Sequence, residues 1–552
     1  MIPQYEESAR TGSRLRQAFL VLGAAALLAP AGAGAPPPKS EAQEEVTRSF
    51  QKTVTLGAGQ SVSVDHSFGG VRIHASSGRD VNINATIRVQ TGSRSDSESF
   101  ADKIKIEVEQ ASDGVRIRTV YPEAEKRWFS FGKRTSYSVN YDIAMPAGAP
   151  LRVKNSFGSV ETSGIHGAAD IENSHGSLTV RDAGPARLND SFGSVELTGA
   201  AGNVFVNDNN GSVQAADVKG ALEVRNRFGN ITARNIQGQA ILSGGNGAVE
   251  VSDAASANIT TSFGRVDARN IHGDLTVRDN NGNVDLANIA GAADITNSFG
   301  SVIFDDVRGR VSVTTNNGRI KGTGLPGPSV TVRDSFGTIE LDTVAGSVDA
   351  ETSNGKIYLR DARGAVTLKT SFGAIEASNI PKGIRAVTGN GGITLTDIGG
   401  ETYAKTSFGA VSIDRVAGNL IVENSNGSVT ARDVKGDAGV NTSFGGVTLE
   451  SIGGRIRVDN QNGAISVTAV KPASGCRDIA LKTSFSAIRV RIPGGVGYNV
   501  TARTSFGHVS TELPITATGT VGGESLTGTI GSGGCQLQLT NSNGNIEILK
   551  AP

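Results

Sequence analysis

One short motif returns through most of the chain at a nearly fixed interval. It ends in glycine preceded by phenylalanine or asparagine, as in NSFGSV at 155–160 and 297–302 and DNNGSV at 208–213. The two versions alternate, with SHG at 174–176 as the exception, and successive glycines are 17, 18 or 19 residues apart. These glycines are Gly158, Gly176, Gly193, Gly211, Gly229, Gly247, Gly264, Gly282, Gly300, Gly318, Gly337, Gly355, Gly373, Gly391, Gly409, Gly427, Gly445 and Gly463. Self-similarity at a fixed period identifies a repeat architecture and outweighs local preference.

Each repeat contains two segments in which apolar and polar residues alternate. The first follows the glycine, as at Val195 and Leu197, and the second follows a turn, as in LEVRN at 222–226. Period-two alternation is typical of strands with one buried face. Such repeats bury the same columns when they stack on one another. The sequence therefore predicts a parallel β-solenoid, right-handed by the usual crossover rule, with about 18 coils, an 18-residue coil and a 36-residue two-coil unit.

The regular array covers residues 151–465, and the chain on either side departs from its period. Residues 46–150 and 466–552 keep strand patterns, and we expect them to be irregular β caps, since open coils would otherwise pair with other chains. Residues 1–35 combine arginines, the apolar run AFLVLGAAALLA and small residues, the pattern of a secretory signal peptide. The alternative is an uncleaved anchor, although the run is shorter than the roughly 20 residues that span a bilayer. Residues 36–45 read as a flexible linker.

The predicted export bears on whether the two cysteines form a disulfide. Cys476 and Cys535 are the only cysteines of the chain, and both lie in the predicted C-terminal cap. An oxidising compartment favours their pairing. The disulfide would close a loop of about 60 residues and contribute roughly 3–4 kcal/mol in the chain-entropy model. The alternative is a pair of buried free thiols.

The phenylalanine of the motif could face the core or the solvent. Val153, Asn155 and Phe157 share the same parity, so strand alternation predicts that Phe157 points inward and packs against the smaller asparagine slots of neighbouring coils. The alternative is an exposed stripe that stacks on sugars or a partner, because the glycine that follows could reverse the parity. The sequence favours inward packing for this column of the array. Its members are Phe157, Phe192, Phe228, Phe263, Phe299, Phe336, Phe372, Phe408 and Phe444.

Two further columns predict how the coils keep their register. The residue two positions before the phenylalanine or asparagine of the motif is nearly always asparagine, aspartate or threonine. This column predicts a hydrogen-bonded ladder at one corner. The position before it alternates in charge through Arg333, Glu351 and Lys369, and again from Lys405 to Glu423. Opposite charges on adjacent strands attract weakly, by a few tenths of a kcal/mol each.

Motifs that would indicate catalysis are not found in the sequence. It has no phosphate-binding loop, no HExxH, no CxxC and no GxSxG. We predict no catalytic residue, no metal site and no cofactor. Polysaccharide lyases and hydrolases also use parallel β-helices, with clustered carboxylates over a cleft walled by loops. The array has almost no insertions, and its one adjacent acid pair is FDDV at 304–307.

One stretch outside the array gathers aromatic and cationic residues. EKRWFSFGKR at 125–134 holds the only tryptophan of the chain. Aromatic rings beside cations suit glycan stacking or anionic polymers. The alternative is a hairpin whose rings cover the first coil while its cations are solvated. The candidate ligand-binding residues are Lys126, Arg127, Trp128, Phe129, Phe131 and Arg134.

Three segments carry a resemblance to a known family. They are VTLGAGQSVSVDHSFGGVRI, YDIAMPAGAPLRVKNSFGSVETSG and GTIGSGGCQLQLTNSNGNIEIL. Across roughly residues 46–552 the chain resembles exported bacterial β-strand-repeat proteins of unknown function, which are often labelled adhesins. The resemblance implies an envelope-associated β-solenoid and brings no catalytic residues.

Together these features predict an exported, non-enzymatic β-solenoid that acts as an adhesin-like binding or scaffolding protein of the bacterial cell envelope. We expect it in the periplasm, at the cell surface or outside the cell, with envelope or extracellular polysaccharide, or a surface protein, as partner. Lys plus Arg and Asp plus Glu both number 53, which argues against nucleic acid. After signal cleavage we expect no membrane insertion. The alternatives are a polysaccharide-degrading lyase or hydrolase and an envelope-stress regulatory or structural protein.

Overall fold

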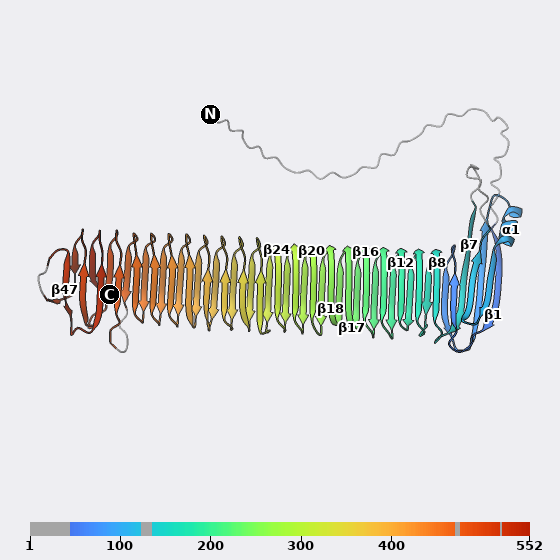
Figure 1. The fold of residues 1–552 in the computed structure, drawn as a ribbon, viewed down its shortest axis with the longest axis horizontal. Coiled ribbons are helices and arrows are strands. Elements are labelled where there is room, and N and C mark those ends of the chain that lie inside the picture. Colours follow the sequence, from blue (N-terminus) through green and yellow to red (C-terminus); the bar gives the residue numbers. More distant parts are fainter. Residues whose placement is uncertain (1–44, 123–134, 470–474, 519–521, 552) are drawn as a thin grey trace, which may run out of the picture.

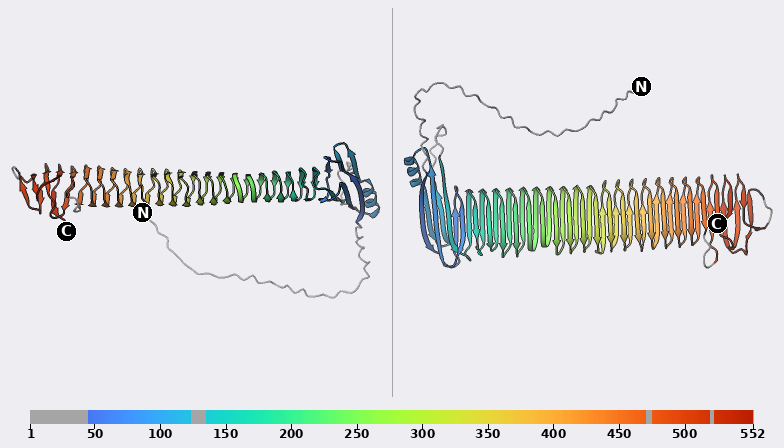
Figure 2. Two further views of the ribbon diagram at one scale, coloured as in Figure 1. Left: turned by 90° about the horizontal axis from the view of Figure 1, so that it is seen from below. Right: turned by 180° about the vertical axis from the view of Figure 1, so that it is seen from behind.

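The protein is a long, straight rod of stacked β coils with an irregular end on each side (Figure 1). A computed structural model describes residues 45–122, 135–469, 475–518 and 522–551. Figure 2 shows that the coils keep one direction along the whole rod and that it is flattened in one dimension. The predicted parallel β-solenoid is confirmed.

Each coil of the array contributes one strand to each of two facing sheets. In the first coil these strands are β8 (Leu151–Phe157) and β9 (Val160–Ser163). Neighbouring coils pair in parallel and in register, with Val153 beside Ile171 in one sheet and Val160 beside Leu178 in the other. Equal apolar positions therefore stack into columns, and the core is the narrow space between the two sheets.

The sheet that precedes the phenylalanine or asparagine slot continues through β10 (Ala169–His175), β12 (Ala186–Phe192), β14 (Val204–Asn210), β16 (Leu222–Phe228), β20 (Leu275–Asn281), β22 (Ala293–Phe299), β24 (Val311–Asn317), β26 (Ser329–Arg333), β28 (Ser347–Glu351), β30 (Val366–Lys369), β32 (Gly383–Val387), β34 (Glu401–Thr406), β36 (Leu420–Asn424), β38 (Ala438–Thr442) and β40 (Ile456–Asn460). The facing sheet continues through β11 (Leu178–Ala183), β13 (Val195–Ala200), β15 (Val213–Val218), β19 (Val266–Ile271), β21 (Val284–Ile289), β23 (Val302–Val307), β25 (Ile320–Leu325), β27 (Ile339–Val344), β29 (Ile357–Ala362), β31 (Ile375–Ile380), β33 (Ile393–Ile398), β35 (Val411–Val416), β37 (Val429–Val434), β39 (Val447–Ile452) and β41 (Ile465–Ala469). Two long strands, β17 (Ile231–Asn246) and β18 (Val249–Phe263), pass from one sheet to the other.

The predicted polar ladder lies inside the corner that joins the two sheets. Asn155, for example, is buried and donates through Nδ2 to the carbonyl of Gly158 at 3.0 Å and to Oδ1 of Asn173 at 3.2 Å. Thr370 occupies the same column and donates to the carbonyl of Gly355 at 3.1 Å. Where these bonds form, they satisfy buried corner carbonyls and fix how one coil sits on the next. Other members of the column, such as Thr261 and Thr315, have a buried hydroxyl without a hydrogen-bond partner.

The corner glycine is required because successive corners approach one another closely. A Cβ atom at Gly355 would lie 1.6 Å from the carbonyl oxygen of Gly337 in the preceding coil. That distance is far below van der Waals contact, and the obstructing atom belongs to the backbone. The recurring glycine is therefore a packing requirement of stacking from Gly158 to Gly463, and Ser486 takes the corner position in the following coil.

The opposite corner turns through residues in the left-handed conformation. Asp217 and Asn235 have φ values of 59° and 52°, and Asn235 Nδ2 donates to Asp217 Oδ1 at 2.6 Å across the coils. Aspartate and asparagine tolerate this conformation better than most residues. This accounts for the turn sequences such as DVKG and NIQG.

The predicted cross-coil ion pairs are also present. Lys369 Nζ lies 2.6 Å from a carboxylate oxygen of Glu351, and Lys405 Nζ lies 2.9 Å from one of Glu423. These side chains are largely exposed, so each pair adds little to stability and mainly favours the correct register.

At the N-terminal end the array is extended by one coil and then covered. Residues 61–76, within the range predicted as a cap, form a coil of the same kind from β2 (Ser61–Asp65) and β3 (Val71–Ser76), on which β8 and β9 stack. Two further strands, at Gly114–Val120 and Ser136–Pro146, pair in parallel with β2 and β3, and antiparallel pairing beyond them ends the stack. The covering elements are β1 (Val46–Thr55), β4 (Asp80–Gln90), α1 (Arg94–Lys103), β5 (Lys105–Ala111), β6 (Gly114–Val120) and β7 (Ser136–Pro146).

At the C-terminal end the order of strands in space departs from their order in the chain. The strand β48 (Cys535–Thr540) lies between β42 (Ile479–Lys482) and β44 (Tyr498–Arg503). The last strand, β49 (Ile546–Lys550), lies between β43 (Ile488–Ile492) and β45 (Val509–Thr511). The antiparallel strand β47 (Ser525–Ile530) then covers β44, and β46 (Ile515–Ala517) pairs with β47. Antiparallel strands at both ends protect the open coils from pairing with other chains.

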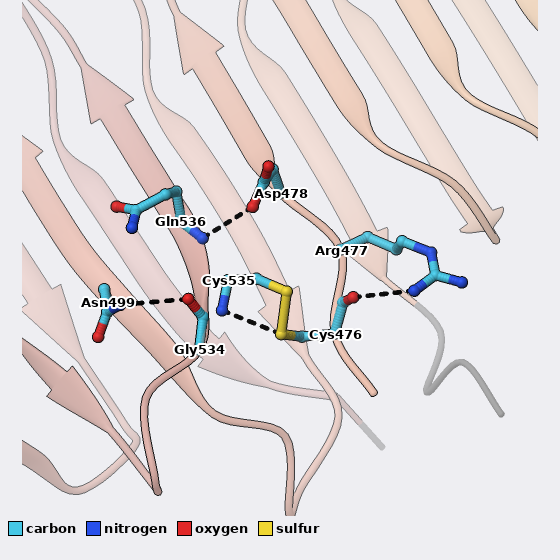
Figure 3. The surroundings of a disulfide bond; sticks show 7 residues. All are labelled: Cys476, Arg477, Asp478, Asn499, Gly534, Cys535 and Gln536. Carbon is cyan, nitrogen blue, oxygen red and sulfur yellow. Dashed lines mark hydrogen bonds between the residues drawn. A yellow bond between two sulfur atoms is a disulfide. The ribbon is translucent and has the colours of Figure 1, made fainter. Parts of the chain in front are cut away.

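The predicted disulfide joins Cys476 to Cys535 and fastens this inserted coil (Figure 3). Beside it, the backbone N–H of Gln536 donates to Asp478 Oδ1 at 3.0 Å, and Asn499 Nδ2 donates to the carbonyl of Gly534 at 3.2 Å. The bond spans 59 residues of sequence, so it ties the start of β48 to the segment that precedes β42.

We expect Gly355→Ala to lower the free energy of unfolding by more than about 2 kcal/mol, because the new methyl group would collide with the backbone of the preceding corner. Gly439→Ala is the matched control, since a Cβ there would meet its nearest atom at 3.9 Å. Urea unfolding followed by circular dichroism measures both. Equal midpoints for the two variants would contradict the packing requirement.

Replacing both Cys476 and Cys535 by serine should lower the stability of the C-terminal end by roughly 3–4 kcal/mol, because the unfolded chain regains the freedom of the closed loop. Hydrogen exchange should show faster exchange in β42, β44 and β48 than in the array. Unchanged exchange in these strands would show that the bond does not hold the inserted coil.

Candidate functional site

The array phenylalanines form an exposed row along one edge of the rod. Their exposed fractions run from 46% at Phe157 to 63% at Phe408. The prediction that this column packs in the core is wrong, and the alternative of an exposed stripe is confirmed. We call this row, from Phe157 to Phe506, the phenylalanine edge. Its members are Phe157, Phe192, Phe228, Phe263, Phe299, Phe336, Phe372, Phe408, Phe444, Phe485 and Phe506.

The shape of the corner explains why strand parity fails. Asn155 is the last residue of its strand to point inward, and Val160 is the first to do so on the other side. Four residues between them carry the chain around the corner, and Asn155 already fills its inner side by bonding to the carbonyl of Gly158. Phe157 therefore lies on the outer side of a turn, where alternation no longer applies.

A signal for this orientation was present in the sequence. The same slot holds Asn210, Asn246 and Asn317 in alternate coils, and these asparagines are exposed. A buried slot would leave such amides in need of partners, which costs stability. A column that accepts phenylalanine and asparagine in turn is thus better explained at the surface.

Phenylalanine and asparagine alternate in space as well as in sequence. Asn210 pairs with Phe228, Phe228 with Asn246, and Asn246 with Phe263, each in the adjacent coil. The alternation of phenylalanine and asparagine continues through the C-terminal end, where the strand order is rearranged. There the inserted coil places Asn543 between Phe485 and Phe506, although the chain visits these residues in a different order.

At the N-terminal end the row becomes a continuous aromatic stack. Phe157 stacks on Phe68 with ring centroids 5.3 Å apart, and His175 stacks between Phe157 and Phe192 at 4.6 Å and 4.9 Å. Tyr121 and Tyr137 contact the other side of Phe68. These contacts turn the faces of the rings along the rod.

The predicted aromatic and cationic site lies outside the described residues. Lys126, Arg127, Trp128, Phe129, Phe131 and Arg134 all fall in the range 123–134. Its described neighbours Tyr121 and Tyr137 lie at the start of the phenylalanine edge, beside Phe68. The ligand-binding role of these six residues remains a prediction.

The phenylalanine edge is nearly free of charge. Two positions of each coil flank the motif: the residue before its phenylalanine or asparagine and the residue after the corner position that follows. These residues are mostly serine, asparagine, alanine or glycine, and none of them is aspartate or glutamate. The cations at these positions are Arg227, Arg265, Arg319 and Lys356. An edge of this composition offers aromatic surface and hydrogen-bonding groups, and little attraction for a polyanion.

Carboxylates do enter the buried ladder behind this edge. Asp190 and Asp208 face each other in adjacent coils, and both are buried. Burial, with a smaller contribution from the charge of Asp208, raises the pKa of Asp190 to about 6. Burial also raises the pKa of Asp208 and of Asp279. These groups are enclosed in the corner, so they cannot reach a substrate.

A shallow groove of about 700 Å³ lies on the sheet formed by β25 to β33, and several of its lining residues are acidic. Asp342 is paired with Arg360, whose hydrogen bond lowers the pKa of Asp342. Glu340 is bound by Arg319 at 2.5 Å. These carboxylates form cross-coil ion pairs, an arrangement that differs from the proton-holding acid of a glycosidase.

Neither a metal centre nor a membrane span is found in the described part of the chain. No group of three or more His, Cys, Asp or Glu side chains within it could hold a metal ion. The described residues also include no helix of the length and apolar character needed to cross a bilayer.

Comparisons with known proteins give little. No protein-family model and no curated protein matches the chain. One solved structure, provisionally described as a cell adhesion protein from Clostridium sporogenes, is 12% identical and covers 40% of this chain and 99% of its own, with a TM-score of 0.18. A TM-score this low supports no argument about fold or function, so the candidate site rests on its own geometry.

We expect Asp190→Asn to raise the melting temperature at pH 7. In the folded protein Asp190 binds a proton near pH 6, whereas its ordinary pKa is 3.8. At pH 7 the buried carboxylate is charged and costs stability, and this cost is relieved as the pH falls through about 6. The asparagine variant should therefore gain less stability than the parent protein between pH 7 and pH 5, as measured by calorimetry.

Asp294→Asn is the control for this comparison, because Asp294 is exposed on β22. It should leave the pH dependence unchanged. Parallel stability curves for the parent protein and Asp190→Asn would show that Asp190 is not a buried acid in solution.

Proposed function

We propose that this protein acts outside the cytoplasm as a non-enzymatic, adhesin-like rod that binds an extended partner along its phenylalanine edge. The observation that carries the proposal is the outward orientation of the whole phenylalanine column. Had these rings packed in the core, a scaffold with a smooth polar surface would be the better proposal.

The exposed phenylalanines are gathered along one edge of the rod. A phenylalanine side chain offers about 200 Å², and the nine array rings are each roughly half exposed. Together they present about 900 Å² in one row, in which an asparagine or histidine separates each ring from the next. Large apolar side chains gathered along one edge and flanked by polar residues mark an interaction surface.

The linear arrangement favours an extended partner over a small molecule. The rings recur every second coil, about 9.6 Å apart at the usual strand spacing, and the pairing of the slots in adjacent coils continues the row from Phe157 to Phe506. One ring holds a partner weakly. Many rings that contact the same partner raise the effective concentration of every further contact.

Two other observations support the remaining parts of the proposal. The disulfide between Cys476 and Cys535 is typical of proteins in oxidising compartments. Two of the three acidic residues that line the sheet groove, Glu340 and Asp342, are paired with Arg319 and Arg360, which fits a structural ion-pair ladder better than a hydrolytic site.

The test replaces four central rings by the residue that already occupies the alternate slots. Phe299→Asn, Phe336→Asn, Phe372→Asn and Phe408→Asn in one protein should fold, because asparagine fits the same corner throughout the array. Beads coated with this variant should lose at least about 10-fold in retention on polysaccharide-coated and protein-coated surfaces.

The matched control removes exposed apolar side chains that lie away from the edge. Ile241→Thr, Ile303→Thr and Ile421→Thr replace residues that are 36–41% exposed on the sheets, and should leave retention unchanged. Equal retention of all three proteins on every surface would exclude the phenylalanine edge as the contact. New reducing ends on any polysaccharide would show that the protein is an enzyme.

A further inference from the structure

The phenylalanine edge has the form of a comb with regular gaps. From Phe192 to Phe506 each pair of successive rings is separated by one coil that carries asparagine in the slot. At about 4.8 Å per coil, the rings on either side of a gap are about 9.6 Å apart. We call each gap an asparagine slot. The nine asparagine slots are at Asn210, Asn246, Asn281, Asn317, Asn354, Asn390, Asn426, Asn462 and Asn543.

The chain itself shows what fits between two such rings. His175 stands in the slot between Phe157 and Phe192 and stacks on both, with centroid distances of 4.6 Å and 4.9 Å. Aromatic pairs are favourable at about 4.5–7 Å. One flat ring per asparagine slot would therefore contact a phenylalanine on each side.

The orientation of the rings argues against a simple sugar platform. Phe157 and Phe192 turn their faces along the rod, toward His175, so their edges point outward. Pyranose rings stack on aromatic faces that are open to solvent. If the later rings follow this N-terminal stack, a partner with flat groups at the two-coil spacing would fill the gaps along the comb.

We propose that this partner is a second copy of the same chain, whose phenylalanines enter the asparagine slots while its own slots receive the phenylalanines of the first. The inference rests on the proposed function, in that the phenylalanine edge is the contact surface. A second copy is the partner whose repeat matches by construction. Each large residue then meets a small one across the interface, as close packing requires.

Symmetry decides the orientation of the two rods. Most dimers have a two-fold axis and use the same patch on both subunits. An axis along the rod would place each phenylalanine opposite its own copy. An axis perpendicular to the rod allows a shift of one coil, so that phenylalanine faces asparagine throughout. The rods must therefore lie antiparallel.

One antiparallel register fills every slot. With the two-fold axis between Phe336 and Asn354, the slot at Asn354 receives Phe336 of the second copy, and the slot at Asn210 receives its Phe485. The nine phenylalanines used are Phe192, Phe228, Phe263, Phe299, Phe336, Phe372, Phe408, Phe444 and Phe485, one for each of the nine asparagine slots.

The N-terminal cap is compatible with this register. β7 begins before its partner β3 and places Tyr137 against Phe68. In Figure 1 β7 and α1 project beyond the array, so a rod lying on the phenylalanine edge must end before them. In the register above, the second copy's last ring, Phe506, is level with the filled slot of His175 at the end of the overlap, so it is not one of the nine interdigitated rings. The overlap thus stops short of Phe68 and of the projecting cap.

Area and charge also suit a second copy. The array rings present about 900 Å² per chain, and a stable interface buries about 800 Å² per partner. The edge carries no carboxylate beside its slots and only four cations, two of which, Arg265 and Arg319, are ion-paired with Asp267 and Glu340 of their own chain. Two such edges would meet with little repulsion between like charges.

The first experiment measures the mass of the purified protein by sedimentation between about 0.1 and 100 μM. We expect a dimer for the parent protein and a monomer for the variant with Phe299, Phe336, Phe372 and Phe408 replaced by asparagine. The loss of affinity should be at least about 100-fold. A parent protein that stays monomeric throughout this range would overturn the inference.

A second variant fills slots instead of removing rings. Asn281→His, Asn317→His, Asn354→His and Asn390→His should fold, because His175 already occupies such a slot, and at pH 8 histidine is neutral. This variant has more aromatic surface than the parent protein, yet it should be monomeric because its gaps are closed. A dimer that persists would overturn the proposed interdigitation.

Cross-linking tests the antiparallel register. With a short bismaleimide, Asn354→Cys should cross-link to its copy near the two-fold axis, whereas Asn543→Cys should not, since its copies lie at opposite ends. Cross-linking at Asn543 would indicate parallel rods and overturn the register.

The two proposals can fail separately. Should the parent protein be monomeric but lose polysaccharide retention when the four phenylalanines become asparagine, the edge binds a glycan and only the second-copy inference fails. Should beads coated with the four-asparagine variant be retained as well as those with the parent protein, the edge is not the contact and both fail.

Discussion

The stacking of one corner glycine directly on the next is the constraint on which the rest of the structure depends. The carbonyl of Gly337 comes so close to Gly355 that no Cβ could lie between them. This contact sets the coils in register and brings the buried ladder within hydrogen-bonding distance of the corner carbonyls, as Thr370 shows. Because every coil of the array obeys the same constraint, the rod is straight and its surface columns are continuous.

The same corner also creates the candidate binding surface. Asn155 fills the inner side of the turn, and that leaves only the outer side for Phe157. The two-coil period therefore places a phenylalanine ring and a gap in alternate coils along the rod. A local steric requirement is thus converted into a long, regular contact surface without any insertion or loop.

The ladder column accepts asparagine, threonine and aspartate, and not every member keeps a side-chain hydrogen bond. Asparagine and threonine donate to the corner carbonyls through Nδ2 and Oγ1. Aspartate can do so only when protonated, which is consistent with the raised pKa of Asp190. The array therefore tolerates carboxylates at this position at some cost in stability near neutral pH. Their burial makes them part of the scaffold and separates them from the binding edge.

The sequence by itself determined the solenoid, its period, the polar ladder and the disulfide, because each depends on a pattern that repeats or on the rarity of cysteine. It could not decide the direction of Phe157, since strand parity stops being a guide where the chain turns. It also could not show that Asn543 lies between Phe485 and Phe506, because that order arises from a strand inserted across the sequence. Only the tertiary structure turns eleven separate phenylalanines, from Phe157 to Phe506, into one edge.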